Sequence, residues 1–269
     1  MTEALFVPDA ADVFAPTDLC RGPWSPDAQH GGPPCALVAR AVERVDAPVP
    51  MAVARLTFEL LRPVPLAPLT VSTEVLRPGK KVQLVGASLR TVDGDVEVLR
   101  AVALRIRRDE RALPEPLAAG GGDGVPALPS SAEEATRPPF ATVDEELRFF
   151  HRDGMEIRVV AGGFDRPGPA TGWFRLRVPV VAGEEPTGVV RAVAAADFGN
   201  GISWVLPPDW LFINPDLTVH LLREPVGEWV CLAARTLPSG AGTGLAESAL
   251  YDAEGRVGRS VQSLLLDAR

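Results

Sequence analysis

Two stretches of this 269-residue chain match letter by letter at a fixed distance. Residues 55–62 read RLTFELLR and residues 216–223 read DLTVHLLR, so the two stretches lie 161 positions apart. The turns at residues 93–94 (DG) and 254–255 (EG) repeat this offset. Because a second match at the same spacing is the signature of an internal duplication, the sequence predicts two copies of one structural unit.

Each copy combines one apolar helix with a following series of strands. In the first copy, a glycine pair and a proline pair open a helix within residues 30–46, since proline is tolerated in a first helical turn. In the second copy, an alanine- and valine-rich run over roughly residues 187–205 predicts the helix. Alternating apolar and polar residues predict strands after each helix, over residues 51–61, 69–76, 82–89, 96–107, 212–222, 228–236, 244–251 and 257–266.

The segment between the copies has a different composition. Proline, glycine, alanine and serine dominate it, and this is typical of a flexible linker. We therefore divide the chain into residues 1–115, a linker at 116–138, and residues 139–269.

Charge and hydropathy exclude several classes of function. The net charge is −8 and no cluster of basic residues offsets it locally, so we expect no nucleic-acid or membrane partner. No signal-like or membrane-spanning run is present, which predicts a cytoplasmic protein. Cys20, Cys35 and Cys231 lack metal-ligand spacing, and we expect neither a metal nor a cofactor. Cys35 at a helix start is interpreted as a core residue, with a nucleophilic role as the alternative.

A helix wrapped by a long antiparallel sheet, twice in one chain, resembles the double hotdog fold. Gly31-Gly32 at the start of the first helix and Leu61-Arg62-Pro63 after the first main strand make it similar to the acyl-CoA thioesterase II-like family. The resemblance implies an α+β protein of two tandem hotdog repeats, each with a sheet around a central helix. It also implies hydrolysis of an acyl-CoA or acyl-carrier thioester in fatty acid metabolism.

The family's catalytic residues fall on three positions of this chain. Its helix aspartate matches Asp197, its last-strand glutamine matches Gln262, and its strand-entry threonine falls on Asn214. The resemblance implies that Asp197 deprotonates a water held jointly with Gln262 and residue 214. Without the resemblance, we would interpret Asp197 as a solvent-facing helix residue and Gln262 as a solvent-facing strand residue. Asn214 would be a turn residue before proline.

The loop before the first helix is the candidate substrate-binding element. Gly31 and Gly32 would let a carbonyl oxygen approach backbone N–H groups at the positive end of the helix, with His30 and Trp24 beside them. The alternative is that the glycines only form a tight loop.

Two rival functions remain open. One is a non-catalytic hotdog protein that binds acyl chains, and the other is a hotdog hydratase or dehydratase. Asp216 and His220 share one face of a strand, but we interpret them as a surface pair, and His151 has no evident partner. Association into a homo-oligomer is compatible with the sequence and not specified by it.

Overall fold

The computed structural model describes residues 3–109, 111, 124–128, 146–207 and 209–268. Most of the predicted linker at 116–138 lies outside the described residues. Residues 124–128 of it are described, and they form neither helix nor strand.

The strands form a single 13-stranded sheet in which neighbours run antiparallel. Their order across the sheet is β1-β2-β4-β5-β6-β3-β10-β13-β12-β11-β8-β7, with β9 paired to β13. The large antiparallel sheet expected from the alternating segments is therefore confirmed. The strands are β1 (Phe6–Ala10), β2 (Val13–Pro16), β3 (Met51–Leu60), β4 (Leu69–Arg77), β5 (Val82–Thr91), β6 (Glu97–Arg107), β7 (Met155–Ala161), β8 (Ala170–Leu176), β9 (Trp210–Ile213), β10 (Asp216–Leu221), β11 (Val230–Pro238), β12 (Thr243–Asp252) and β13 (Gly255–Ala268).

The two strands that match in sequence are direct neighbours at the centre of this sheet. β3 and β10 pair antiparallel, with Thr57 opposite Thr218, and the two hydroxyls lie 3.3 Å apart. Phe58 and Leu217 are also opposite each other, and both are buried. Thr57 and Thr218 are equivalent positions in the two copies. The pairing of the two strands around them therefore has local two-fold symmetry.

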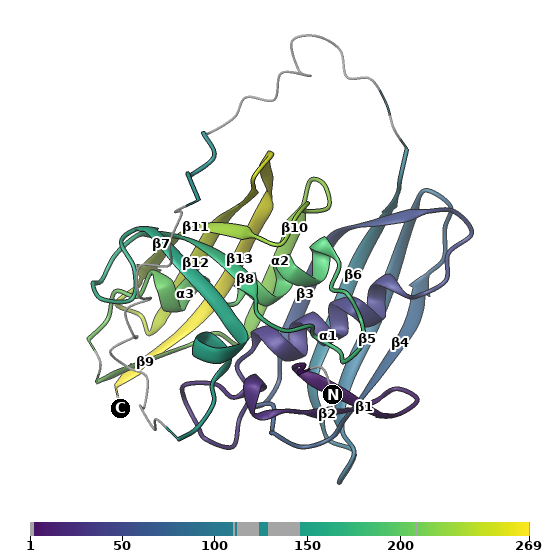
Figure 1. The fold of residues 1–269 in the computed structure, drawn as a ribbon, viewed down its shortest axis with the longest axis horizontal. Helices are drawn as coiled ribbons and strands as arrows, with labels where there is room; N and C mark the ends of the chain where they lie inside the picture. Colours follow the sequence, from purple (N-terminus) through teal and green to yellow (C-terminus); the bar gives the residue numbers. More distant parts are fainter. Residues whose placement is uncertain (1–2, 110, 112–123, 129–145, 208, 269) are drawn as a thin grey trace.

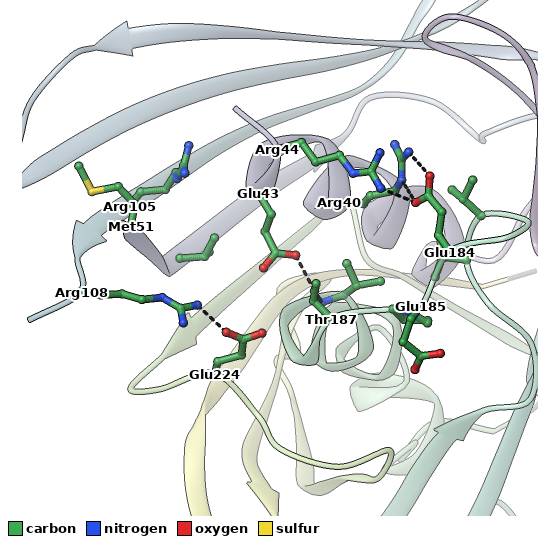
Figure 2. A pocket seen from close by; sticks show the side chains of 15 residues that line it. Arg40, Glu43, Arg44, Met51, Arg105, Arg108, Glu184, Glu185, Thr187 and Glu224 are labelled. Carbon is green, nitrogen blue, oxygen red and sulfur yellow. Dashed lines mark hydrogen bonds and ion pairs between the residues drawn. The ribbon is translucent and has the colours of Figure 1, made fainter. Parts of the chain in front are cut away.

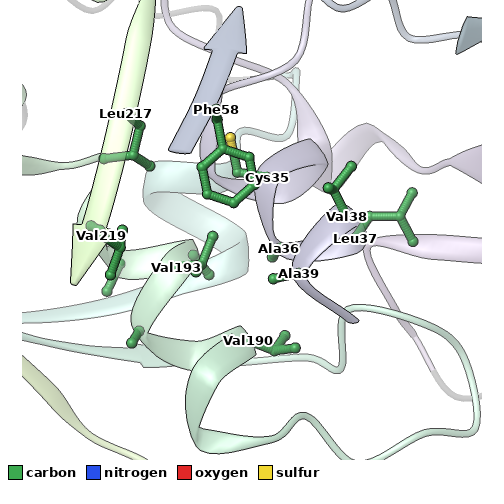
Figure 3. Close-up of a cluster of buried hydrophobic side chains, with 14 of the residues drawn as sticks. Cys35, Ala36, Leu37, Val38, Ala39, Phe58, Val190, Val193, Leu217 and Val219 are labelled. Atoms are coloured by element: carbon green, nitrogen blue, oxygen red, sulfur yellow. The ribbon is translucent and has the colours of Figure 1, made fainter. Parts of the chain in front are cut away.

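The two main helices lie antiparallel to each other on one side of the sheet. α1 (Gly32–Glu43) contacts β3, β4, β5 and β6, and it packs against α2 (Gly188–Ala196) (Figure 1). Cys35, Ala36 and Val38 of α1 join Phe58, Val190 and Val219 in the buried core, as Figure 3 shows. Shorter turns of helix are η1 (Asp18–Cys20), η3 (Phe150–Gly154) and α3 (Gly199–Ile202).

Two predicted elements of the second copy are interrupted. The helix predicted over 187–205 ends at Ala196, with Asp197 as its C-terminal cap, and α3 follows after a break. The break falls at Asp197 and Phe198, and Gly199 and Gly201 lie within the short α3 itself. The strand predicted over 212–222 is divided into β9 and β10 at Asn214-Pro215, where proline lacks the N–H that a ladder needs.

Among the described residues, no helix is both long and apolar enough to cross a membrane.

Candidate active site

Asp197 is a buried carboxylate held by side chains from three other parts of the chain. Its Oδ1 accepts hydrogen bonds from Asn214 Nδ2 at 2.8 Å and from Gln262 Nε2 at 3.3 Å. Its Oδ2 lies 2.8 Å from His30 Nδ1. The structure therefore brings four of the predicted site residues together, although they come from the α1 loop, the α2 C-terminus, the β9–β10 junction and β13.

The position of the proton on His30 follows from this geometry. An unprotonated Nδ1 would place two acceptor atoms 2.8 Å apart, so Nδ1 must carry a proton and donate it to Asp197. The Gly32 N–H lies 3.1 Å from Nδ1 and also reaches the carboxylate. A protonated Nδ1 cannot accept, so we assign the Gly32 N–H to Asp197.

Burial and hydrogen bonding act on Asp197 in opposite directions. Burial raises the pKa of this carboxyl, but the neighbouring His30 and the donors Asn214 and Gly32 more than offset it. The net result is a pKa below the ordinary aspartate value, which keeps the group ionised at neutral pH. Gln262 is itself fixed, because its Oε1 accepts from the Asn200 N–H at 3.2 Å.

The glycine pair is required by the close approach of α1 to the end of α2. A Cβ atom on Gly31 would lie 2.7 Å from Asp197 Oδ2, and one on Gly32 would lie 2.7 Å from the Ala194 carbonyl oxygen. Any larger residue would push the carboxylate or the helix away. The Gly32 N–H, a predicted oxyanion donor, is already engaged by the carboxylate.

A cavity of about 510 Å³ opens beside this cluster. Asp197, Asn214, His30, Gly31 and Trp24 line it, whereas Gln262 and Gly32 do not. Trp24 packs edge-on against Phe212, with ring centroids 5.2 Å apart. The predicted substrate-binding loop therefore meets two of the predicted catalytic residues, Asp197 and Asn214, at one cavity.

His151 lines this cavity although no motif in the sequence points to it. His151 lies on η3, far from the motifs, yet it lines the cavity together with Gln29 and Phe198. Burial, followed by the electrostatic influence of the neighbouring His30 ring, lowers the pKa of His151 to about 3, so the His151 ring is neutral at physiological pH. No local pattern in the sequence could have placed it here.

Other candidates from the sequence lie elsewhere. Burial raises the pKa of the Cys35 thiol well above its usual range, which argues against a nucleophilic thiolate. His220 is exposed, and Asp216 accepts from the Ser263 N–H at 2.5 Å. Within the described ranges, no group of three or more His, Cys, Asp or Glu side chains is arranged to hold a metal ion.

Comparison with known proteins identifies the family. The model described as the acyl-CoA thioesterase N-terminal domain matches residues 20–106, and the one described as the acyl-CoA thioesterase C-terminal domain matches residues 123–266. The chain therefore belongs to the acyl-CoA thioesterase family. No curated protein sequence matches it significantly.

Solved structures share the fold at low sequence identity. A candidate thioesterase from Novosphingobium aromaticivorans is 20% identical, with a TM-score of 0.71 and coverage of 98% of this chain and 99% of that one. A protein of unknown function with a hot dog fold from Alicyclobacillus acidocaldarius is 16% identical, with a TM-score of 0.67 and coverage of 98% and 96%. The acyl-CoA thioesterase II TesB2 from Mycobacterium marinum is 16% identical, with a TM-score of 0.59 and coverage of 100% and 95%. The large antiparallel sheet with few helices is consistent with the fold of hotdog thioesterases.

Proposed function

We propose that this protein hydrolyses an acyl thioester, carried by coenzyme A or an acyl carrier, in the cavity beside Asp197. The observation that carries the proposal is the buried, ionised Asp197, held by Asn214, Gln262 and His30 at the wall of a cavity large enough for an acyl group. Membership of the acyl-CoA thioesterase family supports it. Substrates of this kind belong to fatty acid metabolism.

The reaction needs few groups, because a thioester is already activated. A water must be held near the carbonyl carbon, its proton must be taken up, and the developing oxyanion must be stabilised by donors. In our proposal, the Asp197 cluster activates the water. Gly31 at the start of α1 lies on the cavity wall, so the thioester carbonyl would be placed near the positive end of that helix.

The same proposal divides the chain into two hotdog repeats, at residues 1–115 and 139–269, joined by residues 116–138. The pairing of β3 with β10 and the packing of one helix from each copy against the other support this division. The single catalytic centre would then lie at one end of the contact between the repeats.

One observation favours a second candidate, the hydration of an enoyl thioester. An aspartate and a histidine in direct contact at 2.8 Å form an acid–base pair of the kind that adding water to a double bond requires. A protein that only binds acyl chains is the third possibility.

A turnover screen separates the three. The protein is incubated with short, medium, long and aromatic acyl-CoAs and with an enoyl-CoA, and both free thiol and the enoyl absorbance are followed. We expect free thiol to appear with at least one saturated acyl-CoA. Loss of enoyl absorbance without thiol release would replace the proposal by hydration, and binding without either reaction would replace it by acyl binding.

A further inference from the structure

The Asp197 carboxylate is closely surrounded by donors from this chain. A carboxylate offers about four acceptor positions, two on each oxygen. Asn214 and Gln262 occupy both positions on Oδ1. On Oδ2, His30 Nδ1 occupies one position at 2.8 Å, and the Gly32 N–H also donates to the carboxylate. A carboxylate that already accepts from several donors and has a lowered pKa is a weak base, so it is poorly suited to take a proton directly from water.

The second ring nitrogen of His30, Nε2, has no donor bound to it in the described part of the chain. Because Nδ1 carries the proton that Asp197 accepts, a neutral ring keeps its lone pair on Nε2. Nε2 has no hydrogen-bond partner in the part of the chain that the structure describes. Some polar side-chain atoms there are fully buried and have no partner, and His151 Nδ1 is one of them. His30 Nε2 is not among these atoms, so it is not fully buried. Since His30 lines the cavity, Nε2 is its accessible, unsatisfied acceptor.

Packing fixes the ring in this orientation. The His30 ring stacks on Phe198, with centroids 4.6 Å apart and an angle of 30° between the planes, and it lies 5.2 Å from the Phe150 ring. Only 11% of its side chain is exposed. A base held by aromatic contacts on its faces and by a carboxylate on one edge loses little entropy on reaction.

We propose that His30 is the catalytic base of the hydrolysis and that Asp197 is a positioning residue, which orients the ring and stabilises its protonated form. This inference rests on the proposed function. His30 Nε2 removes a proton from water while the water oxygen bonds to the thioester carbon and the carbonyl electron pair moves onto oxygen. When the carbonyl re-forms, the C–S bond breaks with its electron pair on sulfur, and Nε2–H returns the proton. The products are a carboxylic acid and a thiol.

The decisive variant is His30→Asn. The Asn amide nitrogen can replace Nδ1 as donor to Asp197, but nothing replaces Nε2. We expect kcat to fall by ~10²–10⁴-fold, because general-base action contributes a factor of this size to the rate. KM should change by less than about threefold. His220→Asn, on the exposed part of β10, is the matched control and should retain full turnover.

A rescue experiment and a spectrum distinguish chemistry from structure. In His30→Ala, added imidazole should restore part of the lost turnover, because the space left by the ring opens onto the cavity beside Asp197. In the ¹⁵N spectrum of the unmodified protein, the neutral form of the His30 ring should carry its proton on Nδ1 and not on Nε2. This second measurement needs neither turnover nor a folded variant.

Each outcome has one meaning. Turnover by His30→Asn within a few-fold of the starting protein, or a ring protonated only at Nε2, would overturn the role of His30 and leave hydrolysis intact. A starting protein that releases no thiol from any acyl-CoA would instead overturn the proposed function, and with it this inference, whatever the spectrum shows.

Discussion

The two ends of the α1–α2 helix pair place an acidic side chain in the same position, and they differ in the groups that surround this side chain. At each end, the start of one helix faces a carboxylate near the end of the other, an arrangement that the helix dipole favours. Asp197 lies against Gly31-Gly32, and Glu43 lies against Thr187, whose hydroxyl donates to Glu43 Oε2 at 2.6 Å. Only the first of these carboxylates is surrounded by neutral amide donors and a histidine.

Ion pairs dominate the second end. A pocket of about 340 Å³ is lined by Glu43 and its neighbours. In it, Arg108 pairs with Glu224, and Arg40 and Arg44 both pair with Glu184 (Figure 2). Burial raises the pKa of Glu43, and the Thr187 hydrogen bond only partly offsets this. The pKa of Asp197 shifts in the opposite direction. Helix packing alone therefore does not set the pKa of the carboxylate, because the direction of the pKa shift differs between the two ends with the groups that surround each side chain.

The largest expected effect is the difference between neutralising the two carboxylates. Asp197→Asn removes the charge that supports the His30 ring, so we expect turnover to fall by ~10²–10⁴-fold. Glu43→Gln should leave turnover within about threefold. Steady-state thiol release measures both. Equal losses in the two variants would mean that the ends are functionally alike.

A methyl group at Gly31 should separate geometry from charge. Gly31→Ala places a Cβ 2.7 Å from Asp197 Oδ2, so the carboxylate or α1 must shift. We expect a loss of about 1–3 kcal/mol in the free energy of unfolding and at least a tenfold loss of turnover. Gly240→Ala is the control, because its Cβ would meet no atom within 4 Å. Normal activity in Gly31→Ala would show that the Asp197 geometry is not critical.

The Asn214 donor can be removed or exchanged. Asn214→Ala deletes the 2.8 Å hydrogen bond to Oδ1, which should raise the pKa of Asp197 and lower turnover about tenfold. Asn214→Thr supplies a hydroxyl that can donate to the carboxylate, and we expect its turnover to equal or exceed that of the starting protein. Measured kcat values decide. If threonine is as damaging as alanine, the amide geometry itself is required.

The smallest expected effect is on stability, and its sign differs between the ends. The pKa of Asp197 is lowered by folding, so its contribution to stability is present at neutral pH and is lost as pH falls through its folded pKa. The pKa of Glu43 is raised, so its contribution is present at low pH and is lost as pH rises through its folded pKa.

At pH 7, Glu43→Gln should therefore raise Tm by a few degrees at most, and Asp197→Asn should lower it. Both differences should shrink below about pH 4, where the unfolded carboxyls are protonated. Melting curves at pH 7 and at the lowest pH that preserves the fold provide the test. Shifts of the same sign in both variants at pH 7 would contradict the opposed pKa directions.

Local periodicity and the repeat predicted the sheet, and the resemblance indicated Asp197, Gln262 and Asn214. Alternation along a strand and helical spacing are local properties, so the sequence records them directly. The contact between His30 and Asp197 is not local, because it depends on two helices lying antiparallel with glycines at their closest approach. His151 reaches the cavity on a turn of helix that carries no motif, so only the fold could place it.

The most direct test of the account is a structure of the protein with an acyl-CoA analogue whose sulfur bears a 2-oxoalkyl group and which cannot be hydrolysed. We predict that its carbonyl lies in the cavity beside Asp197, within hydrogen-bond distance of the start of α1, and that its acyl chain extends along Trp24. We also predict that the pocket around Glu43 stays without ligand. An analogue bound at the Glu43 end, with the Asp197 cavity unchanged, would contradict the account.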